Sequence, residues 1–299
     1  MAIQIADGLR KKISSRAAAS GGFAPLGGRP PRPDCTAWAI LALASMGEPR
    51  NDLLPARRFL AACQAPDGSV PFSPEQPSAW WPTALAVLAW SGAPEFSQAQ
   101  AKAVAFLLGH AGHHYKRKPD SPLGHDTDLQ GWPWVANTHA WVEPTAMAVV
   151  ALRATGHGDH PRVAEAVRLL VDRQLSHGGW NSGNTLAFGV ELRPMPDATG
   201  MALASLPGLV PRVDLQNSLD YLSSGLRQSL TPLSFAWSLL GLSAWSVPAP
   251  DVTADVGRIL SRQAKLGEYD TSEFSQLLMA NQARRGMLDL AMTLQREGA

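Results

Sequence analysis

Six copies of one apolar, alanine-rich segment run along the chain and constrain its fold more than any other feature. Each copy opens on Asp or Thr, or on Pro followed by Thr, which cap a helix or set its first turn. Several copies end at a glycine, as at Gly92 and Gly156, which is a common C-terminal stop. The segments are apolar on nearly every side, so each is predicted to be a helix buried all round. They begin near Asp34, Trp81, Glu143, Asp197, Thr231 and Asp270.

Amphipathic segments with charge on one face alternate with these buried ones. They span residues 53–64, 97–108, 163–174, 215–225, 252–263 and 287–297. A buried and a half-exposed helix alternating six times would close as two concentric rings, with the inner helices parallel to one another. We therefore predict an all-α fold, an (α/α)6 toroid of six inner and six outer helices, with an extra amphipathic N-terminal helix near residues 2–19.

One domain accommodates this arrangement. A chain of 299 residues that is 45% hydrophobic can bury one large core. We predict that residues 1–33 form the N-terminal helix and a Gly/Pro-rich tether, and that residues 34–299 form a single toroid domain.

Charge and cysteine content exclude several classes of protein. The formal net charge is only +1, so nucleic acid is not an expected partner. Cys35 and Cys63 cannot form a disulfide framework or a CxxC zinc finger.

No signal peptide or membrane-spanning run is evident, so a cytoplasmic location is expected. A basic N-terminal stretch would suit peripheral contact with an anionic membrane, although a solvated helix face is the simpler explanation; it comprises Arg10, Lys11, Lys12 and Arg16.

A second pattern follows several amphipathic segments, in which a helix ends in Gln and a glycine turn and an aromatic residue come next. It occurs at Gln64 to Phe72, at Gln174 to Trp180, and more loosely at Gln263 to Tyr269. We expect the Gln amide to bond the exposed end of the next inner helix and the aromatic ring to cover the joint.

Through these joints and the T-A-x-A inner helices at Thr36, Thr83 and Thr145, the chain resembles the terpenoid cyclase and protein prenyltransferase α/α-toroid superfamily. The joints look like the Gln-Trp (QW) repeats of squalene cyclases. The resemblance covers nearly the whole chain. It implies the toroid fold and an isoprenoid, either a polyprenyl chain or a prenyl diphosphate, in a central apolar cavity, cyclised or transferred by acid or metal-assisted carbocation chemistry.

Two carboxylates are candidate catalytic residues. Type II terpene cyclases protonate an alkene with the middle acid of an Asp-x-Asp-Asp-Thr-Ala motif, and Asp34 falls on that position. Its two acidic companions are replaced by Arg32 and Cys35, and Arg32 would favour the ionised form of Asp34. Glu143 precedes a proline at the start of an inner helix, where it could act as a general acid or base or simply stabilise the helix N-terminus.

A metal site is suggested by the prenyltransferase resemblance, since those enzymes hold zinc through an Asp, a Cys and a His. Parallel inner helices would bring Cys35, His139 and Asp197 to one rim, with Asp34 as an alternative ligand. Zinc would suit such ligands. The family's Asp-x-Cys spacing is absent, and no cofactor is certain; zinc or magnesium is the candidate.

The long connection at 109–141 holds five of the eight histidines and a basic run. Lys116 and Arg117 would suit a diphosphate, and His125 with Asp126 and Asp128 would suit a metal. The alternative is a solvated excursion without a ligand.

Tryptophans recur on the inner helices and their joints. In a terpenoid-binding toroid, such rings would line the cavity and stabilise cations face-on; in the alternative they only fill the space between helices. The predicted substrate-binding rings are Trp38, Trp81, Trp132, Trp134, Trp141, Trp180 and Trp237.

Three functions follow from these patterns. The first is an isoprenoid-binding cyclase-like or prenyltransferase-like protein. The second is a non-catalytic toroid that binds or scaffolds an unknown partner, which the broken acidic motif favours. The third is an (α/α)6 glycan hydrolase or lyase, which would need paired carboxylates across the cavity.

Overall fold

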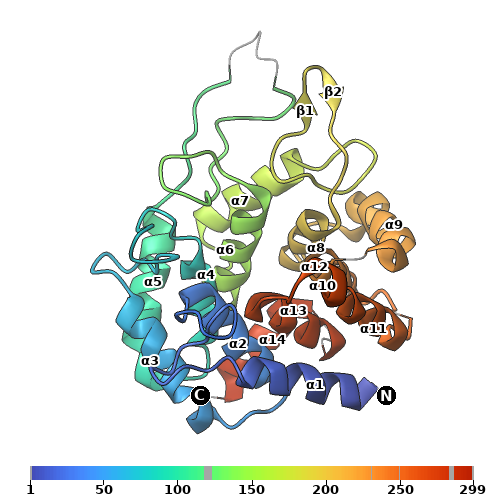
Figure 1. Ribbon diagram of the computed structural model, residues 1–299. Helices are drawn as coiled ribbons and strands as arrows, with labels where there is room; N and C mark the ends of the chain where they lie inside the picture. The colour runs from blue at the N-terminus through green and yellow to red at the C-terminus, as the bar shows by residue number, and fades with distance from the viewer. Residues whose placement is uncertain (1, 118–122, 230, 249, 283–285, 298–299) are drawn as a thin grey trace.

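The computed structural model describes residues 2–117, 123–229, 231–248, 250–282 and 286–297. Six helices form a closed inner ring, in which each contacts the next and the last contacts the first (Figure 1). The ring consists of α2 (Pro33–Ser45), α4 (Pro82–Ala89), α6 (Val142–Ala154), α8 (Pro196–Ser205), α10 (Pro232–Ala244) and α13 (Thr271–Gln282). The predicted α/α toroid is confirmed.

Five helices cover this ring from outside. They are α3 (Leu54–Cys63), α5 (Ser97–Gly109), α7 (Pro161–Asp172), α9 (Gln216–Gly225) and α11 (Thr253–Ser261). Short helices precede or follow several of them: η1 (Arg50–Leu53), η2 (Pro94–Phe96), η3 (Arg212–Leu215), η4 (Leu226–Gln228) and α12 (Gln263–Leu266). A small hairpin of β1 (Leu186–Ala187) and β2 (Val190–Glu191) projects beside the 109–141 connection (Figure 1).

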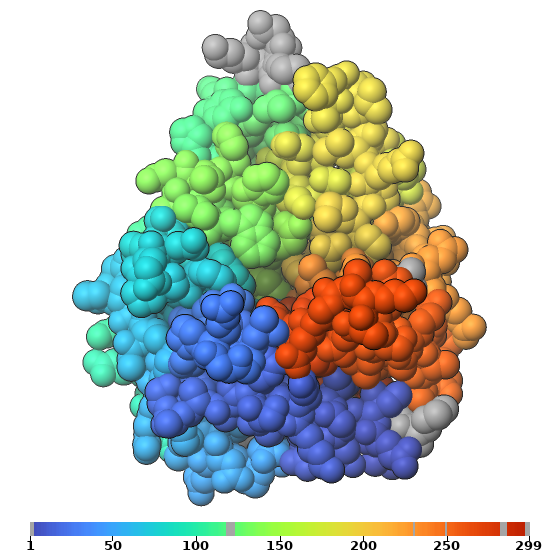
Figure 2. Space-filling model, viewed as in Figure 1, coloured from blue at the N-terminus to red at the C-terminus, as the bar shows by residue number. Residues whose placement is uncertain are grey.

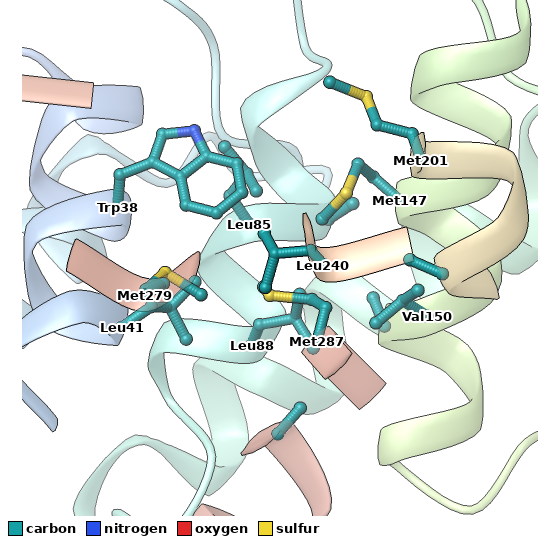
Figure 3. Close-up of a cluster of buried hydrophobic side chains, with 14 of the residues drawn as sticks. Trp38, Leu41, Leu85, Leu88, Met147, Val150, Met201, Leu240, Met279 and Met287 are labelled. Carbon is teal, nitrogen blue, oxygen red and sulfur yellow. The ribbon is translucent and has the colours of Figure 1, made fainter. Parts of the chain in front are cut away.

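The two terminal helices take places that the sequence pattern did not predict. The N-terminal helix α1 (Ala2–Ser14) packs on α13 and also contacts α2 and α11, so it occupies the sixth outer position. The C-terminal helix α14 (Gly286–Glu297) instead contacts three inner helices, α6, α8 and α10. Its residue Met287 belongs to the same buried cluster as Leu88 and Leu240, so α14 closes the C-terminal end of the ring (Figure 3). Amphipathicity showed that residues 287–297 cover an apolar surface, but not which one.

The basic residues of the N-terminal region largely form ion pairs within the molecule. Arg10 lies 3.6 Å from Glu48, and both Lys12 and Arg16 pair with Glu268. Within the described ranges, no helix combines the length and the apolar character needed to cross a bilayer. Peripheral membrane contact and the domain boundary at residue 33 stay predictions.

Threonines near the starts of the inner helices tie the joints to the ring. The backbone N–H groups of Val70, Trp132 and Trp180 each donate to a threonine hydroxyl of the following inner helix, at 2.9 to 3.0 Å; the acceptors are Thr83, Thr145 and Thr199. Each bond satisfies a buried backbone donor that would otherwise be costly to leave unpaired.

Two of the three joint glutamines bind the next outer helix rather than the next inner helix that was expected, whereas Gln263 bonds Leu260 and the backbone N–H of Tyr269 nearby in the chain. The side-chain amide of Gln64 donates to the carbonyl of Ala99 in α5 at 2.9 Å, and that of Gln174 donates to the hydroxyl of Ser218 in α9 at 2.9 Å. These two hydrogen bonds therefore link successive outer helices around the outside of the ring.

Helices α8 and α10 approach each other more closely than any side chain would allow at their crossing. A Cβ on Gly200 would collide with the carbonyl of Trp237, and a Cβ on Gly241 would lie 2.8 Å from the Cα of Gly200. Glycine is therefore required at position 200 for the backbones to meet.

We predict that Gly200→Ala lowers the free energy of unfolding by at least about 2 kcal/mol, because the added methyl forces the two inner helices apart. Gly257→Ala, in the middle of α11, is the matched control, since a Cβ there meets nothing within 4 Å. It should stabilise the protein by up to about 1 kcal/mol through helix propensity. Urea denaturation of both variants measures the difference, and equal stabilities would contradict the close-approach argument.

Candidate functional site

A cavity of about 290 Å³ opens at the end of the ring where the inner helices begin. All six inner helices or the residues just before them contribute to its wall, together with Trp134 from the long connection. Its lining residues are Asp34, Trp38, Trp81, Leu85, Trp134, Glu143, Pro144, Met147, Asp197, Met201, Leu233, Asp270, Ser272, Glu273 and Gln276. We call this the rim cavity. The inner helices therefore run parallel, as predicted.

The interior of the rim cavity is apolar and aromatic. Trp38, Leu85, Met147 and Met201 surround its deeper part (Figure 3). Trp81 and Trp134 pack edge to face with ring centres 5.2 Å apart. Three of the seven predicted tryptophans thus line one cavity.

Carboxylates occupy the outer edge of the same cavity because acids stand in the first turns of the inner helices or just before them, where the helix dipole favours negative charge. They are Asp34, Glu143, Asp197, Asp270 and Glu273. A simple spacing links this edge to the interior. The residue four positions after Asp34, Glu143 and Asp197 is in each case an apolar lining residue one helical turn deeper.

Arg32 neutralises the acid that the cyclase motif would place as proton donor. Its Nε and Nη2 atoms donate to the two carboxylate oxygens of Asp34 at 2.6 and 2.7 Å. Arg32 also lies 3.6 Å from a carboxylate oxygen of Asp270, and its guanidinium sits 4.5 Å above the ring of Phe72. This bidentate, charge-assisted pair occupies both oxygens of the Asp34 carboxyl group.

Glu143 is in the opposite situation. Only 6% of the residue is exposed, and its Oε2 atom is buried without a hydrogen-bond partner in the part of the chain that the structure describes. Burial raises the pKa of Glu143 to about 7, although hydrogen bonds from its own backbone and from Ser182 act in the other direction. A large fraction of Glu143 is therefore protonated at neutral pH.

The remaining acids of the rim combine structural and electrostatic roles. Asp270 and Glu273 form a reciprocal cap at the start of α13, in which each side chain accepts the backbone N–H of the other at 2.9 and 2.8 Å. Burial raises the pKa of both residues and also that of Asp197. Asp270 thus has the capping function expected of an acid before a threonine, and it also lines the cavity.

Four predicted tryptophans lie elsewhere. Trp132 and Trp180 are buried, and their indole N–H groups donate to the carbonyls of Leu107 and Leu170 in the preceding outer helices. Trp237 is buried behind Trp38, with ring centres 5.9 Å apart. These three rings therefore do not line the rim cavity: Trp132 and Trp180 fill helix joints, whereas Trp237 belongs to the inner helix α10 and packs against Trp38. Trp141 lines a second cavity.

The three proposed metal ligands do not come together. Asp197 lines the rim cavity, whereas His139 lines the second cavity. Burial raises the pKa of Cys35 to about 12, so its sulfur remains a thiol, and it accepts a hydrogen bond from the Ser272 hydroxyl at 3.4 Å. Among the residues that the structure describes, no three His, Cys, Asp or Glu side chains are placed to hold a metal. The second proposed set, His125, Asp126 and Asp128, therefore does not form a metal site either.

The predicted diphosphate contacts also miss the rim cavity. Lys116 and Arg117 are exposed on the long connection and are not among the residues that line it. Residues 118–122 lie outside the described part of the chain. Six further lining residues were not predicted from the sequence: Leu85, Met147, Met201, Leu233, Glu273 and Gln276. Met147 and Met201 could have been predicted, because each lies four positions after a first-turn acid.

Comparison with known proteins identifies the fold. No protein-family model and no curated protein matches the sequence. Among solved structures, the type II terpene cyclase MstE from Scytonema, in complex with geranylgeranyl dihydroxybenzoate, matches with a TM-score of 0.53 and 17% identity over 96% of this chain and 82% of that one. A glycosidase in complex with glucose matches with a TM-score of 0.57 and 12% identity over 96% of both chains. A protein from Actinoplanes matches with a TM-score of 0.52 and 22% identity over 96% of this chain and 82% of that one.

The chain has the α/α-toroid fold of these proteins. Identities of this size show the fold alone. The terpene cyclase and the glycosidase share it, so the chemistry must be argued from the side chains of this chain.

Because the pKa of Glu143 is raised in the folded protein, the free energy of unfolding should depend on pH. The folded protein holds this proton up to about pH 7, whereas the unfolded chain releases it near pH 4.5. The stabilisation of the folded protein by this proton is therefore fully present below pH 4.5. It is lost as the pH rises to about 7, which lowers the free energy of unfolding by up to about 3 kcal/mol. Glu143→Gln should match the wild type at pH 4 and exceed its free energy of unfolding at pH 8.

Glu165→Gln on α7 is the control, because that carboxylate forms a partly exposed pair with Arg162 at 2.9 Å. It should gain no stability over the same range. Urea denaturation at pH 4, 6 and 8 measures all three proteins. A constant difference between Glu143→Gln and the wild type would contradict the assigned pKa.

Proposed function

We propose that the rim cavity binds an isoprenoid and that Glu143 is its general acid. The observation that carries the proposal is a buried carboxyl group, with an unpartnered oxygen among the described residues and a raised pKa, at the edge of an apolar cavity lined by three indoles. The apolar walls would desolvate a hydrocarbon, while the acid is held where the hydrocarbon must pass.

The size of the cavity bears on the substrate. A volume of about 290 Å³ lies at the lower end of the usual range for small-molecule sites, about 300–1,000 Å³. A short prenyl compound, or one end of a longer polyprenyl chain, fits that volume. None of the described residues that line the cavity is a Lys or Arg, so the prenyl group rather than a diphosphate is the portion proposed to bind there.

The proposed reaction begins with proton transfer. The π electrons of a terminal alkene take the proton of Glu143, so one alkene carbon gains a C–H bond and the other becomes a carbocation. The indoles of Trp38, Trp81 and Trp134 would stabilise that cation through their ring faces. A second alkene can then close a ring, and loss of a proton to the Glu143 carboxylate restores the acid.

Asp34 is assigned a different role from the one its motif position implies. A proton donor must be protonated, and both oxygens of Asp34 are held by Arg32. We infer that the Arg32 and Asp34 pair fixes the entrance between α2 and α13, where Arg32 also reaches Asp270. The terpene cyclase relative is described with a prenylated substrate, which supports the isoprenoid.

Glycan hydrolysis is the second candidate, favoured by the several carboxylates around one cavity and by the glycosidase relative described with glucose. The apolar interior of Leu85, Met147 and Met201 favours the isoprenoid, because a sugar presents hydroxyl groups that this wall cannot bond. A binding or scaffolding role without chemistry would keep the cavity but need no acid.

Binding is tested by calorimetric titration of the purified chain with geraniol and with glucose. We expect geraniol to bind and Trp81→Ala to weaken it by about 10-fold or more, because the ring lines the rim cavity. Trp141→Ala is the matched control, since that ring lines the other cavity. Binding of glucose but not geraniol would favour the glycan candidate, and equal losses in the two variants would contradict the assigned cavity.

Catalysis is tested by incubation with squalene and with geranylgeraniol, followed by product analysis. Glu143→Gln should lower turnover by about 10²-fold or more, and wild-type turnover should fall as the pH rises through about 7. Asp34→Asn should retain that pH dependence. If Asp34→Asn abolishes turnover while Glu143→Gln does not, the acid has been assigned to the wrong residue; if neither substrate changes, the binding role is favoured.

A further inference from the structure

A second cavity, of about 280 Å³, is lined by residues of the 109–141 connection together with Arg173, just after α7, and Gly183 and Asn184. Its floor is buried: His125 is 4% exposed, Arg173 6% and Thr127 7%. His113 and His139 are exposed and form its mouth. We call it the histidine cavity.

Backbone hydrogen bonds hold the mouth of the histidine cavity in place. The N–H of His113 donates to the carbonyl of Thr138 at 2.7 Å, and the N–H of Tyr115 donates to that of Thr127 at 2.9 Å. The rings of His113, Tyr115 and His139 lie together as a result, with centres 5.7 to 6.0 Å apart. These described parts of the connection form a built wall rather than the solvated excursion considered from the sequence.

The described lining of this cavity differs from that of the rim cavity: it contains Arg173 and three histidines, and none of these described lining residues is an Asp or Glu. Arg173 is fixed at the floor, since its Nη1 donates to the carbonyl of Gly183 at 2.7 Å and its Nη2 to that of Asp126 at 3.0 Å. Its Nε donates to Asp172 at 3.2 Å, so these bonds use three of its five N–H donors.

One polar atom at the floor points to a ligand. The Nδ1 atom of His125 is buried and has no hydrogen-bond partner among the described residues. Leaving a buried polar group unpaired is energetically costly, so a hydrogen-bonding ligand in the cavity would stabilise this site. Tyr115 and Trp141 add aromatic surface beside it.

We propose that the histidine cavity binds a small organic phosphate, with the phosphoryl group between Arg173 and His125 and the organic part against Trp141. Arginine and imidazole N–H groups suit the oxygens of a phosphoryl anion. Trp141 and Gly183 both line the histidine cavity, and the Trp141 ring lies 3.3 Å from where a Cβ of Gly183 would be. Glu143, two residues after Trp141, lines the rim cavity instead. The site is separate from the rim cavity and does not depend on the proposed function.

Binding should be linked to protonation of His125. Burial, followed by the charges of Arg173, Arg117 and His139, lowers the pKa of His125 to about 4, and Asp126 opposes this shift. A bound anion favours the imidazolium form and raises that pKa. Binding of the anion is therefore expected to be accompanied by proton uptake at His125.

The test is calorimetric titration of the full chain with phenyl phosphate, inorganic phosphate and phenol. Phenyl phosphate should bind, and His125→Gln should weaken its binding by about 10-fold. His114→Gln is the matched control, because His114 belongs to the same connection but does not line the cavity. It should bind as the wild type does.

Each other outcome decides the proposal. Equal binding of inorganic phosphate and phenyl phosphate would support a phosphoryl site that is used by the free anion. Phenol binding as tightly as phenyl phosphate, no binding by either phosphate, or equal losses in His114→Gln and His125→Gln would overturn it. If His125→Gln fails to fold, His139→Gln at the exposed mouth replaces it and should lower the affinity by a smaller factor.

Discussion

Closure of the inner ring is the constraint on which the rest of the structure depends. The inner helices pack side by side around the ring, and α8 and α10 approach so closely that Gly200 and Gly241 meet where they cross. Because the helices are parallel, their N-termini converge at one end. A carboxylate that merely favours its own helix electrostatically is thereby brought beside the carboxylates of its neighbours.

The apolar interior that stabilises the ring also sets the chemistry at its rim. Burial disfavours the charged form of Glu143, whereas Arg32 compensates the charge of Asp34. Two acids in equivalent first turns consequently differ in character, because one has a cationic neighbour two residues earlier in the chain and the other does not. The two cavities differ in the ionisable side chains around them: carboxylates line the rim cavity, whereas imidazoles and Arg173 line the histidine cavity.

The toroid was predictable because it depends on a periodic signal that needs no knowledge of distant contacts. The inner helices are apolar on every side, and that property alone distinguishes them from the outer ones. The exchange of places between α1 and α14 was not predictable, since both are amphipathic and either could have covered α13. The glutamine contacts were misassigned for a related reason: Gln64 can reach either neighbouring element, and only the packed structure shows that it binds α5.

For the candidate site, the sequence by itself determined which residue types stand at the starts of the inner helices: acids at Asp34, Glu143 and Asp197, and tryptophans at Trp38 and Trp81. It also determined the Arg32 substitution in the cyclase-like motif. Only the tertiary structure decided which indoles face the cavity, because Trp132 and Trp180 fill joints through bonds to outer helices. It also decided which acid is protonated, because desolvation depends on what every neighbouring helix places around the carboxyl group, and local sequence does not contain that information.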